Sequence, residues 1–220
     1  KKKNTDINLS FIKKEKSKYK IYIKINNVNK YFYLNSCFES DVQNLLASIG
    51  VISIFKNIKK LNSNIFYNHN TLNGRGDISK IKLFKKSFYL IDQSYNSNPL
   101  SLNSAFTNFD MIKVDNSKKH LILGDMLELG KYSKKLHVEA AQSINKTSIK
   151  NVNVIGKHVR HTYRALNEDK KGLILKNNSE IIELIKNNIN NNDYLMIKGS
   201  NSTGLNKLTN DIKVGKINAL

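Results

Sequence analysis

Residues 92–99 form the first of three short segments whose residue types could bind an anionic ligand. The segment offers a carboxylate, hydroxyls and amides, and it lies between the apolar run 88–91 and a stretch with helical spacing that Pro99 opens. A helix N-terminus attracts phosphate, because its free N–H groups and the helix dipole both favour negative charge. Asp, Asn and Ser are also ordinary turn and cap residues, so a capped turn without a ligand is the alternative interpretation.

The second segment, residues 123–130, places Asp125 and Glu128 three positions apart after another apolar run. The two carboxylates could orient an amine or a metal ion, or they could be ordinary residues at a helix start. The segment also imitates a phosphate-binding loop. Five residues separate Gly124 from Gly130, however, whereas the Walker pattern has four between its glycines. We therefore reject a P-loop here, and the sequence has none elsewhere.

Residues 198–204, the third segment, combine Lys198 with two glycines and three hydroxyl side chains ahead of a helical stretch. Such a segment suits a phosphate or a peptide carboxylate, because a lysine and free N–H groups can surround an anion. Alone, this segment is a weak signal.

The histidines and the single cysteine predict no metal site in this chain. Only His158 and His161 have a spacing that metal ligands use, and they lie in a basic stretch, so we expect the histidines at the surface. We expect Cys37 to be a buried structural thiol, because no partner for a nucleophile accompanies it. A single cysteine also excludes an internal disulfide, which fits a reducing compartment.

The elements that must position the three segments alternate along the second part of the chain. The strand-length apolar runs are 88–91, 120–123, 152–155, 172–175 and 194–197. The stretches with helical spacing are 100–109, 133–145, 157–166, 179–188 and 204–212. Most of the runs do not alternate with polar residues, as is typical of strands covered on both faces. The pattern predicts an α/β fold with an open, mostly parallel sheet, whose ligands bind at the carboxyl ends of the strands.

The first part of the chain has a different pattern. Residues 7–11, 19–25 and 31–34 alternate with the strand period, and residues 39–56 have the spacing of an amphipathic helix. We expect an antiparallel meander followed by a helix, and then a connection over residues 59–71. This partial domain should span residues 1–73, and a second domain should span residues 74–220.

Composition limits the classes of protein that remain. The 220 residues include 37 basic and 17 acidic side chains, for a net charge of +20, yet only three of the basic residues are arginine. Codon usage in an A+T-rich genome explains this composition at least as well as nucleic-acid binding does, so a basic nucleic-acid-binding module stays as an alternative. No apolar run is long enough to span a membrane. We expect a cytoplasmic protein with no nucleic-acid partner.

Four motifs together resemble those of the Mur ligase family. They are Gly74-Arg75-Gly76, the run Ile-Asp-Gln-Ser-Tyr-Asn-Ser-Asn-Pro over residues 91–99, Leu-Gly-Asp-Met-Leu-Glu-Leu-Gly over residues 123–130, and Lys-Gly-Ser at 198–200 followed by Gly-Leu at 204–205. Residues 41–47 are similar to the start of the family's helix beside adenine. The Tyr-Asn-Ser-Asn-Pro element is typical of the branch that adds D-alanyl-D-alanine, since sister ligases carry Asp-Tyr-Ala-His-x-Pro there.

The resemblance implies a Rossmann-like C-terminal domain over residues 74–220, preceded by part of a central ATPase domain. It also implies an activity. ATP phosphorylates the terminal carboxylate of UDP-N-acetylmuramoyl-tripeptide, the amine of D-alanyl-D-alanine attacks the acyl phosphate, and Mg²⁺ neutralises charge. The alternative within the superfamily is another ATP-dependent amide ligase, similar to folylpolyglutamate synthase, with glutamate as acceptor.

The resemblance also assigns site residues by role. The residues it places at the nucleotide are Asn44, Arg75, Asp92 and Asn96. The residues it places at the incoming dipeptide or the transition state, as catalytic groups, are Lys198 and Ser200. The residues expected to contact substrate are Ser94, Tyr95, Asp125 and Glu128.

The sequence also departs from the family pattern. Gln93 replaces a second acid, Asp41 replaces an asparagine of the adenine helix, and Asn201 replaces an arginine, which removes a fixed cation from this position. The chain begins with three lysines and no methionine, and it lacks the family's P-loop, modified lysine and magnesium-binding acid. We therefore expect a monomeric C-terminal fragment that is inactive alone and exposes apolar surface that the rest of the enzyme would cover.

Overall fold

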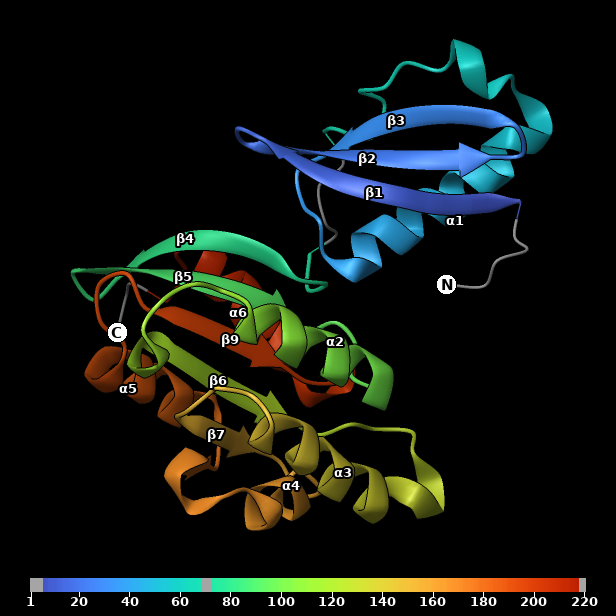
Figure 1. The fold of residues 1–220 in the computed structure, drawn as a ribbon. Coiled ribbons are helices and arrows are strands. Elements are labelled where there is room, and N and C mark those ends of the chain that lie inside the picture. Colours follow the sequence, from blue (N-terminus) through green and yellow to red (C-terminus); the bar gives the residue numbers. More distant parts are fainter. Residues whose placement is uncertain (1–5, 69–72, 218–220) are drawn as a thin grey trace. The chain divides into compact units, whose positions relative to one another are not determined.

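The computed structural model describes residues 6–68 and 73–217. The chain forms two compact units, residues 1–70 and 71–220, and each unit is described by itself (Figure 1). The domain boundary that the sequence predicted, after residue 73, lies slightly beyond the boundary between these two units, and it stays a prediction. No helix among the described residues is long and apolar enough to cross a membrane.

The first unit is an antiparallel meander with a helix packed on one face. Its strands are β1 (Ile7–Glu15), β2 (Lys18–Ile25) and β3 (Val28–Leu34), in that order in the sheet, and its helix is α1 (Glu39–Phe55). A short 3₁₀ turn, Ile58–Lys60, follows. Alternate residues of β2 point toward α1, so Ile21 and Ile23 are buried against Leu45 and Ile49. The meander and the helix that the sequence predicted are both confirmed.

The second unit is built around a six-stranded sheet with the order β4-β5-β9-β6-β7-β8. Its strands are β4 (Asp77–Leu83), β5 (Lys86–Gln93), β6 (Lys119–Gly124), β7 (Val152–Ile155), β8 (Lys171–Leu175) and β9 (Tyr194–Lys198). β4 pairs antiparallel with β5, and the other neighbouring strands are parallel. The α/β fold with a mostly parallel sheet is confirmed.

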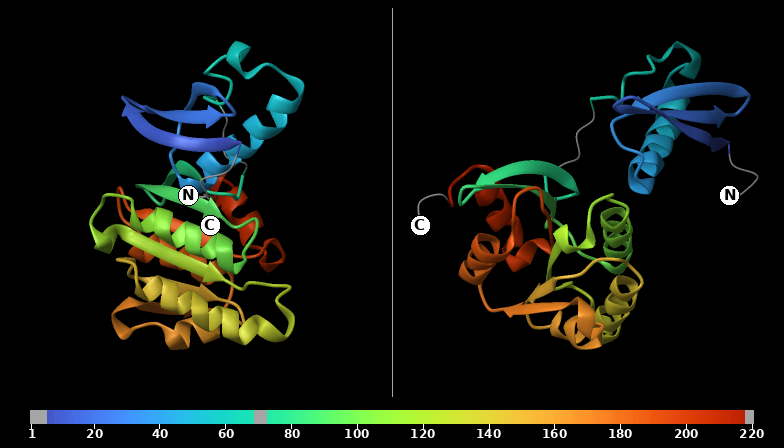
Figure 2. Two further views of the ribbon diagram at one scale, coloured as in Figure 1. Left: turned by 45° about the vertical axis from the view of Figure 1, so that its right-hand side comes forward. Right: turned by 60° about the vertical axis from the view of Figure 1, so that its left-hand side comes forward.

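Helices cover both faces of this sheet, which gives three layers (Figure 2). The helices are α2 (Pro99–Asp110), α3 (Ser133–Asn145), α4 (Arg160–Ala165), α5 (Asn178–Asn188) and α6 (Leu205–Lys213). One buried cluster joins the sheet to α2 and α3, and another joins it to α5 and α6. The strands therefore have apolar neighbours on both sides, which explains their non-alternating sequences.

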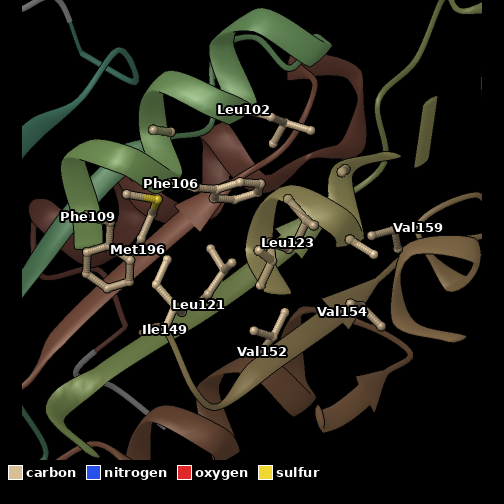
Figure 3. Close-up of a cluster of buried hydrophobic side chains, with 14 of the residues drawn as sticks. Leu102, Phe106, Phe109, Leu121, Leu123, Ile149, Val152, Val154, Val159 and Met196 are labelled. Atoms are coloured by element: carbon tan, nitrogen blue, oxygen red, sulfur yellow. The ribbon is translucent and has the colours of Figure 1, made fainter. Parts of the chain in front are cut away.

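The core between α2 and the sheet shows how the site is supported. Leu102, Phe106 and Phe109 of α2 point toward Leu121 of β6 and Met196 of β9 (Figure 3). All five side chains are almost fully buried. Burial of each such side chain contributes roughly 1.5–3 kcal/mol to the stability of the fold. These contacts attach α2 to the sheet, and α2 in turn supports the loop that precedes it.

The expected positions of three side chains and the expected length of one helix were wrong. His120 and His137 are buried, not at the surface, because each ring takes part in a hydrogen bond inside the domain. Cys37 is only half-buried. The helix expected over residues 157–166 is shorter, since residues 156–159 form a loop before Arg160. His69 lies outside the described residues.

Candidate functional site

The three segments singled out in the sequence follow three strands that are neighbours in the sheet. β9 lies between β5 and β6, and its last residue, Lys198, pairs in register with Gln93 of β5 and Leu123 of β6. The strands are parallel, so their carboxyl ends meet at one edge, where ligands bind in open α/β sheets. The chain thus brings residues about a hundred positions apart in sequence to one place.

Lys198 and Ser200 join these segments. The Lys198 ammonium donates a hydrogen bond to the main-chain carbonyl of Asn96 at 2.8 Å. The Ser200 amide donates to the carbonyl of Asp125 at 3.0 Å, and its Oγ accepts from the Leu127 amide at 2.9 Å. The Ser200 hydroxyl also donates to the Ser97 carbonyl at 3.4 Å. The third segment is therefore the link between the first two.

The charge of Lys198 has no carboxylate partner among the described residues. The side chain is fully buried, and this burial lowers the pKa of the ammonium from 10.5 to about 8. Lys198 is still mostly protonated at pH 7. A buried cation with one neutral acceptor creates a positive potential at this edge of the sheet.

Asp92 is buried at the end of β5 with both carboxylate oxygens engaged. Its Oδ1 accepts hydrogen bonds from the amide and the hydroxyl of Ser94, at 3.0 and 2.5 Å. Its Oδ2 pairs with the Lys213 ammonium at 2.5 Å, and the same ammonium pairs with Asp77 Oδ2 at 2.5 Å. Burial by itself lowers the pKa of Lys213, but the hydrogen bonds and the negative charges of Asp77 and Asp92 together raise that pKa above its ordinary value.

The Gly-Arg-Gly segment lies against the segment that follows β5. The Gly76 amide donates to the Asp92 carbonyl at 2.6 Å, and the Tyr95 amide donates to the Gly74 carbonyl at 3.1 Å. Gly74 has a φ of +78°, and a Cβ there would lie 2.8 Å from the Tyr95 Cβ, so only glycine fits. The Arg75 guanidinium lies 4.7 Å from the centre of the Tyr95 ring, and both side chains are exposed. Arg75 and Tyr95 together form an exposed cationic and aromatic surface, which we call the shelf.

The carboxylates of the second segment have different surroundings. Asp125 is buried, and its two oxygens accept hydrogen bonds from the amides of Lys157 and Val159, at 3.0 and 2.7 Å. Glu128 is exposed and has a φ of +62°. Asp125 therefore anchors the loop that follows β7, and the expected substrate contacts of both residues stay predictions.

The N-terminus of α2 already satisfies much of its own hydrogen bonding. The Asn98 side chain accepts from the Ser101 amide, and the Ser101 hydroxyl accepts from the Asn98 amide. Pro99, the first helical residue, has no N–H to offer. A phosphate would have to compete with this cap.

The remaining predicted residues lie in mixed positions. Ser94 is buried within the hydrogen-bonded turn, whereas the side chain of Asn96 is exposed. Asn44 is exposed on α1, in the first unit, and its expected contact with adenine stays a prediction. The Ser97 hydroxyl is buried without a hydrogen-bond partner among the described residues.

Sequence reasoning missed Asp77, Lys213 and His137. His137 Nε2 accepts from the Met126 amide at 3.1 Å and its Nδ1 lies 2.8 Å from the Ser133 carbonyl, which ties residues 125–130 to α3. Burial lowers the pKa of His137, so the neutral tautomer fits these contacts. The alternation of residues 80–83 could have revealed part of β4, whose first residue, Asp77, lies opposite Asp92. Lys213 gives no signal in the sequence.

A separate cavity lies at the opposite edge of the sheet, where the parallel strands begin. It has a volume of about 590 Å³, and its lining includes His120, Asn153 and Asp193. His120 Nε2 lies 3.1 Å from Asp193 Oδ2, and burial lowers the pKa of His120 although Asp193 acts in the other direction. None of the predicted site residues lines this cavity. Within the described residues, no group of three His, Cys, Asp or Glu side chains could hold a metal ion.

Comparison with known proteins is consistent with this geometry. Residues 80–201 match the family model described as "Mur ligase, glutamate ligase domain". A UDP-N-acetylmuramoyl-tripeptide–D-alanyl-D-alanine ligase of Rickettsia prowazekii is 30% identical over 135 residues, which cover 61% of this chain and 29% of the relative. A Bacillus subtilis protein of the same name is 27% identical over 126 residues, 56% of this chain and 27% of the relative.

Solved structures share the fold. MurF from Thermotoga maritima in complex with ADP matches 97% of this chain and 47% of its own, at a TM-score of 0.75 and 16% identity. MurF from Acinetobacter baumannii matches 96% of this chain and 46% of its own, at a TM-score of 0.77 and 18% identity. This chain thus spans less than a third of its curated relatives and about half of these solved chains.

The sheet order and the helices on both faces define the second unit as a Rossmann-like α/β domain. The family match covers more than half of the residues, and the chain belongs to the Mur ligase family.

Proposed function

We propose that this chain is the acceptor-side part of an ATP-dependent amide ligase that adds D-alanyl-D-alanine to UDP-N-acetylmuramoyl-tripeptide. The observation that carries the proposal is the meeting of the three motif segments at the ends of β5, β9 and β6. The names of the curated relatives support the choice of substrates, because those that match carry this activity in their names.

The shelf of Arg75 and Tyr95 is the proposed contact for the nucleotide. A guanidinium stacked on a ring presents a flat, cationic surface, which suits a purine base or a ribose more than a phosphate group. Asp92 and Ser94 support the shelf indirectly, because the hydrogen bonds between them stabilise the turn that carries Tyr95 and Asn96. Asn96 has an exposed side chain and can contact the nucleotide directly.

Lys198 and Ser200 are proposed to serve the acyl-transfer step. In that step the tripeptide carboxylate takes up a phosphoryl group, the dipeptide amine then attacks the carbonyl carbon, and the C–O bond to phosphate breaks. Negative charge develops near the carboxyl edge of the sheet, where the unpaired charge of Lys198 stabilises it through space. Lys198 also holds the Asn96 carbonyl, so its loss would alter the nucleotide segment too.

The β- and γ-phosphates need a further binding element. The sequence contains no P-loop, and the described residues offer no carboxylate cluster for Mg²⁺. We propose that these groups are bound by another part of the enzyme, and that the residues of this chain do not ligate Mg²⁺. The proposed location is the cytoplasm, where the nucleotide-linked substrate is available, and the proposed state is a monomer.

The test is ADP release from Mg-ATP, UDP-N-acetylmuramoyl-tripeptide and D-alanyl-D-alanine. One arm uses this chain alone, and a second uses it joined to the upstream half of the Bacillus subtilis relative. Activity in the joined protein only, lost when D-alanyl-D-alanine is omitted, is the expected result. Activity with glutamate in place of the dipeptide would favour a folylpolyglutamate synthase-like ligase. Activity in neither arm, with a folded joined protein, would contradict the proposal.

A further inference from the structure

The pairing of β4 with β5 places two carboxylates directly opposite each other. Asp77 pairs in register with Asp92 across this antiparallel ladder. Like charges at opposite positions of a ladder repel, and Asp92 is fully buried whereas Asp77 is largely so. The arrangement therefore needs a cation between the two carboxylates.

Lys213, near the end of α6, supplies that cation. Its ammonium lies 2.5 Å from Asp77 Oδ2 and 2.5 Å from Asp92 Oδ2. The lysine side chain is largely buried, so water does not screen the two ion pairs as it would at the surface. We call these three residues, Asp77, Asp92 and Lys213, the clasp.

The second oxygen of each carboxylate reaches one of the two proposed nucleotide segments. Asp77 Oδ1 accepts from the Gly74 amide at 2.8 Å, next to Arg75. Asp92 Oδ1 accepts from the Ser94 amide and hydroxyl, next to Tyr95. The clasp is thus the point at which both halves of the Arg75–Tyr95 shelf are fixed relative to each other.

We propose that Lys213 is a positioning residue for nucleotide binding, because it sets the stacking of Arg75 on Tyr95 through Asp77 and Asp92. This inference rests on the proposed function and adds to it a residue that touches no ligand. Without Lys213, the two carboxylates must separate or take up a proton. Either change loosens the Gly74 or the Ser94 hydrogen bonds and moves one half of the shelf.

The test is binding of ADP by calorimetry to the joined protein of the preceding subsection, together with the amide NMR signals of Gly74 and Tyr95 in the 220-residue chain. Lys213→Met should weaken ADP binding about tenfold, as removal of a supporting partner typically does, and should shift both amide signals. The matched control is Lys216→Met. Lys216 lies just beyond the same helix, is exposed, and approaches Asp211 only to 3.9 Å. This control should bind ADP as the unmodified joined protein does.

Two further variants keep the test decisive if Lys213→Met fails to fold. Asp77→Asn leaves the Lys213–Asp92 pair in place and should weaken ADP binding less, with a shift of the Gly74 amide signal. Lys213→Arg keeps the charge and should restore most of the affinity.

The outcomes separate this inference from the proposed function. Equal ADP binding by the unmodified joined protein and by the folded clasp variants would overturn the inference alone. If the unmodified joined protein fails to bind ADP although it is folded, the nucleotide role of this domain and the positioning role of Lys213 both fall.

Discussion

The ammonium of Lys198 donates its hydrogen bond to the main-chain carbonyl of Asn96, 2.8 Å away and about a hundred residues earlier in the chain. A lysine at the end of the central strand β9 thereby fixes the loop that follows the neighbouring strand β5. The contact needs only the backbone of residue 96, so it leaves the Asn96 side chain free for a ligand. Lys198 combines a structural contact with a charge directed at the carboxyl edge of the sheet.

Burial of Lys198 predicts a specific dependence of stability on pH. The pKa of the ammonium is about 8 in the folded chain and about 10.5 in the unfolded chain, so the unfolded chain binds more protons between these values. The free energy of unfolding should therefore rise through this window, relative to Lys198→Met, by up to about 3 kcal/mol. Urea denaturation at pH 7.5, 9 and 10.5 measures this difference.

Lys134→Met is the control for that experiment, because Lys134 is exposed on α3. It loses the same formal charge but should show the pH dependence of the unmodified chain. Parallel stability curves for the unmodified chain and for Lys198→Met would show that the buried ammonium is not perturbed.

The clasp predicts a large loss of stability when its cation is removed. Lys213→Met leaves the buried Asp92 and the nearby Asp77 without their counter-ion, which should cost about 3–5 kcal/mol at pH 7. Chemical denaturation at pH 7, beside Lys216→Met, checks the prediction, and a loss below about 1 kcal/mol would contradict it.

The Asp125 anchor predicts that Gly156 cannot carry a side chain. Gly156 has a φ of +132°, and a Cβ there would lie 2.5 Å from Asp125 Oδ1. Gly156→Ala should displace the carboxylate from the Lys157 and Val159 amides and lower the unfolding free energy by about 2–4 kcal/mol. Thermal unfolding measures this loss.

Gly130→Ala provides the comparison for Gly156→Ala. Gly130 also has a positive φ, +51°, but a Cβ added there would meet no atom within 4 Å. Its replacement should cost only about 1 kcal/mol, the ordinary penalty for a left-handed alanine. Similar losses for the two variants would mean that the contact with Asp125 contributes nothing.

The high positive charge predicts weak, unspecific binding to nucleic acid. With only three arginines, the chain offers few bidentate contacts to bases or phosphates, so its affinity for a single-stranded oligonucleotide should be weaker than about 10 µM near 0.15 M salt. Fluorescence anisotropy across a salt series tests this expectation. Tight binding with a steep salt dependence would contradict this prediction and favour the alternative function, a basic nucleic-acid-binding module.

The parallel strands and most helices could be predicted because their sequence patterns are local. The apolar run 194–197 marks β9, and Asn98 with Pro99 marks the start of α2. Strand β4 was missed because its sequence alternates only over residues 80–83, and Lys213 was missed because its role depends on the β4–β5 register. The sequence also could not show that Lys213 pairs with Asp92, or that the amides of Lys157 and Val159 donate to Asp125, because these partners lie far away along the chain.

The cap of α2 has a consequence for how a ligand would bind. Asn98 and Ser101 cap the start of the helix through reciprocal hydrogen bonds, and Lys198 donates a hydrogen bond to the carbonyl of Asn96 in the loop before it. The conformational entropy of residues 96–101 is therefore lost when the chain folds, not when the ligand arrives. Heating short of unfolding should leave this loop as ordered as the sheet beneath it, so the temperature dependence of ligand affinity should reflect the ligand's own contacts.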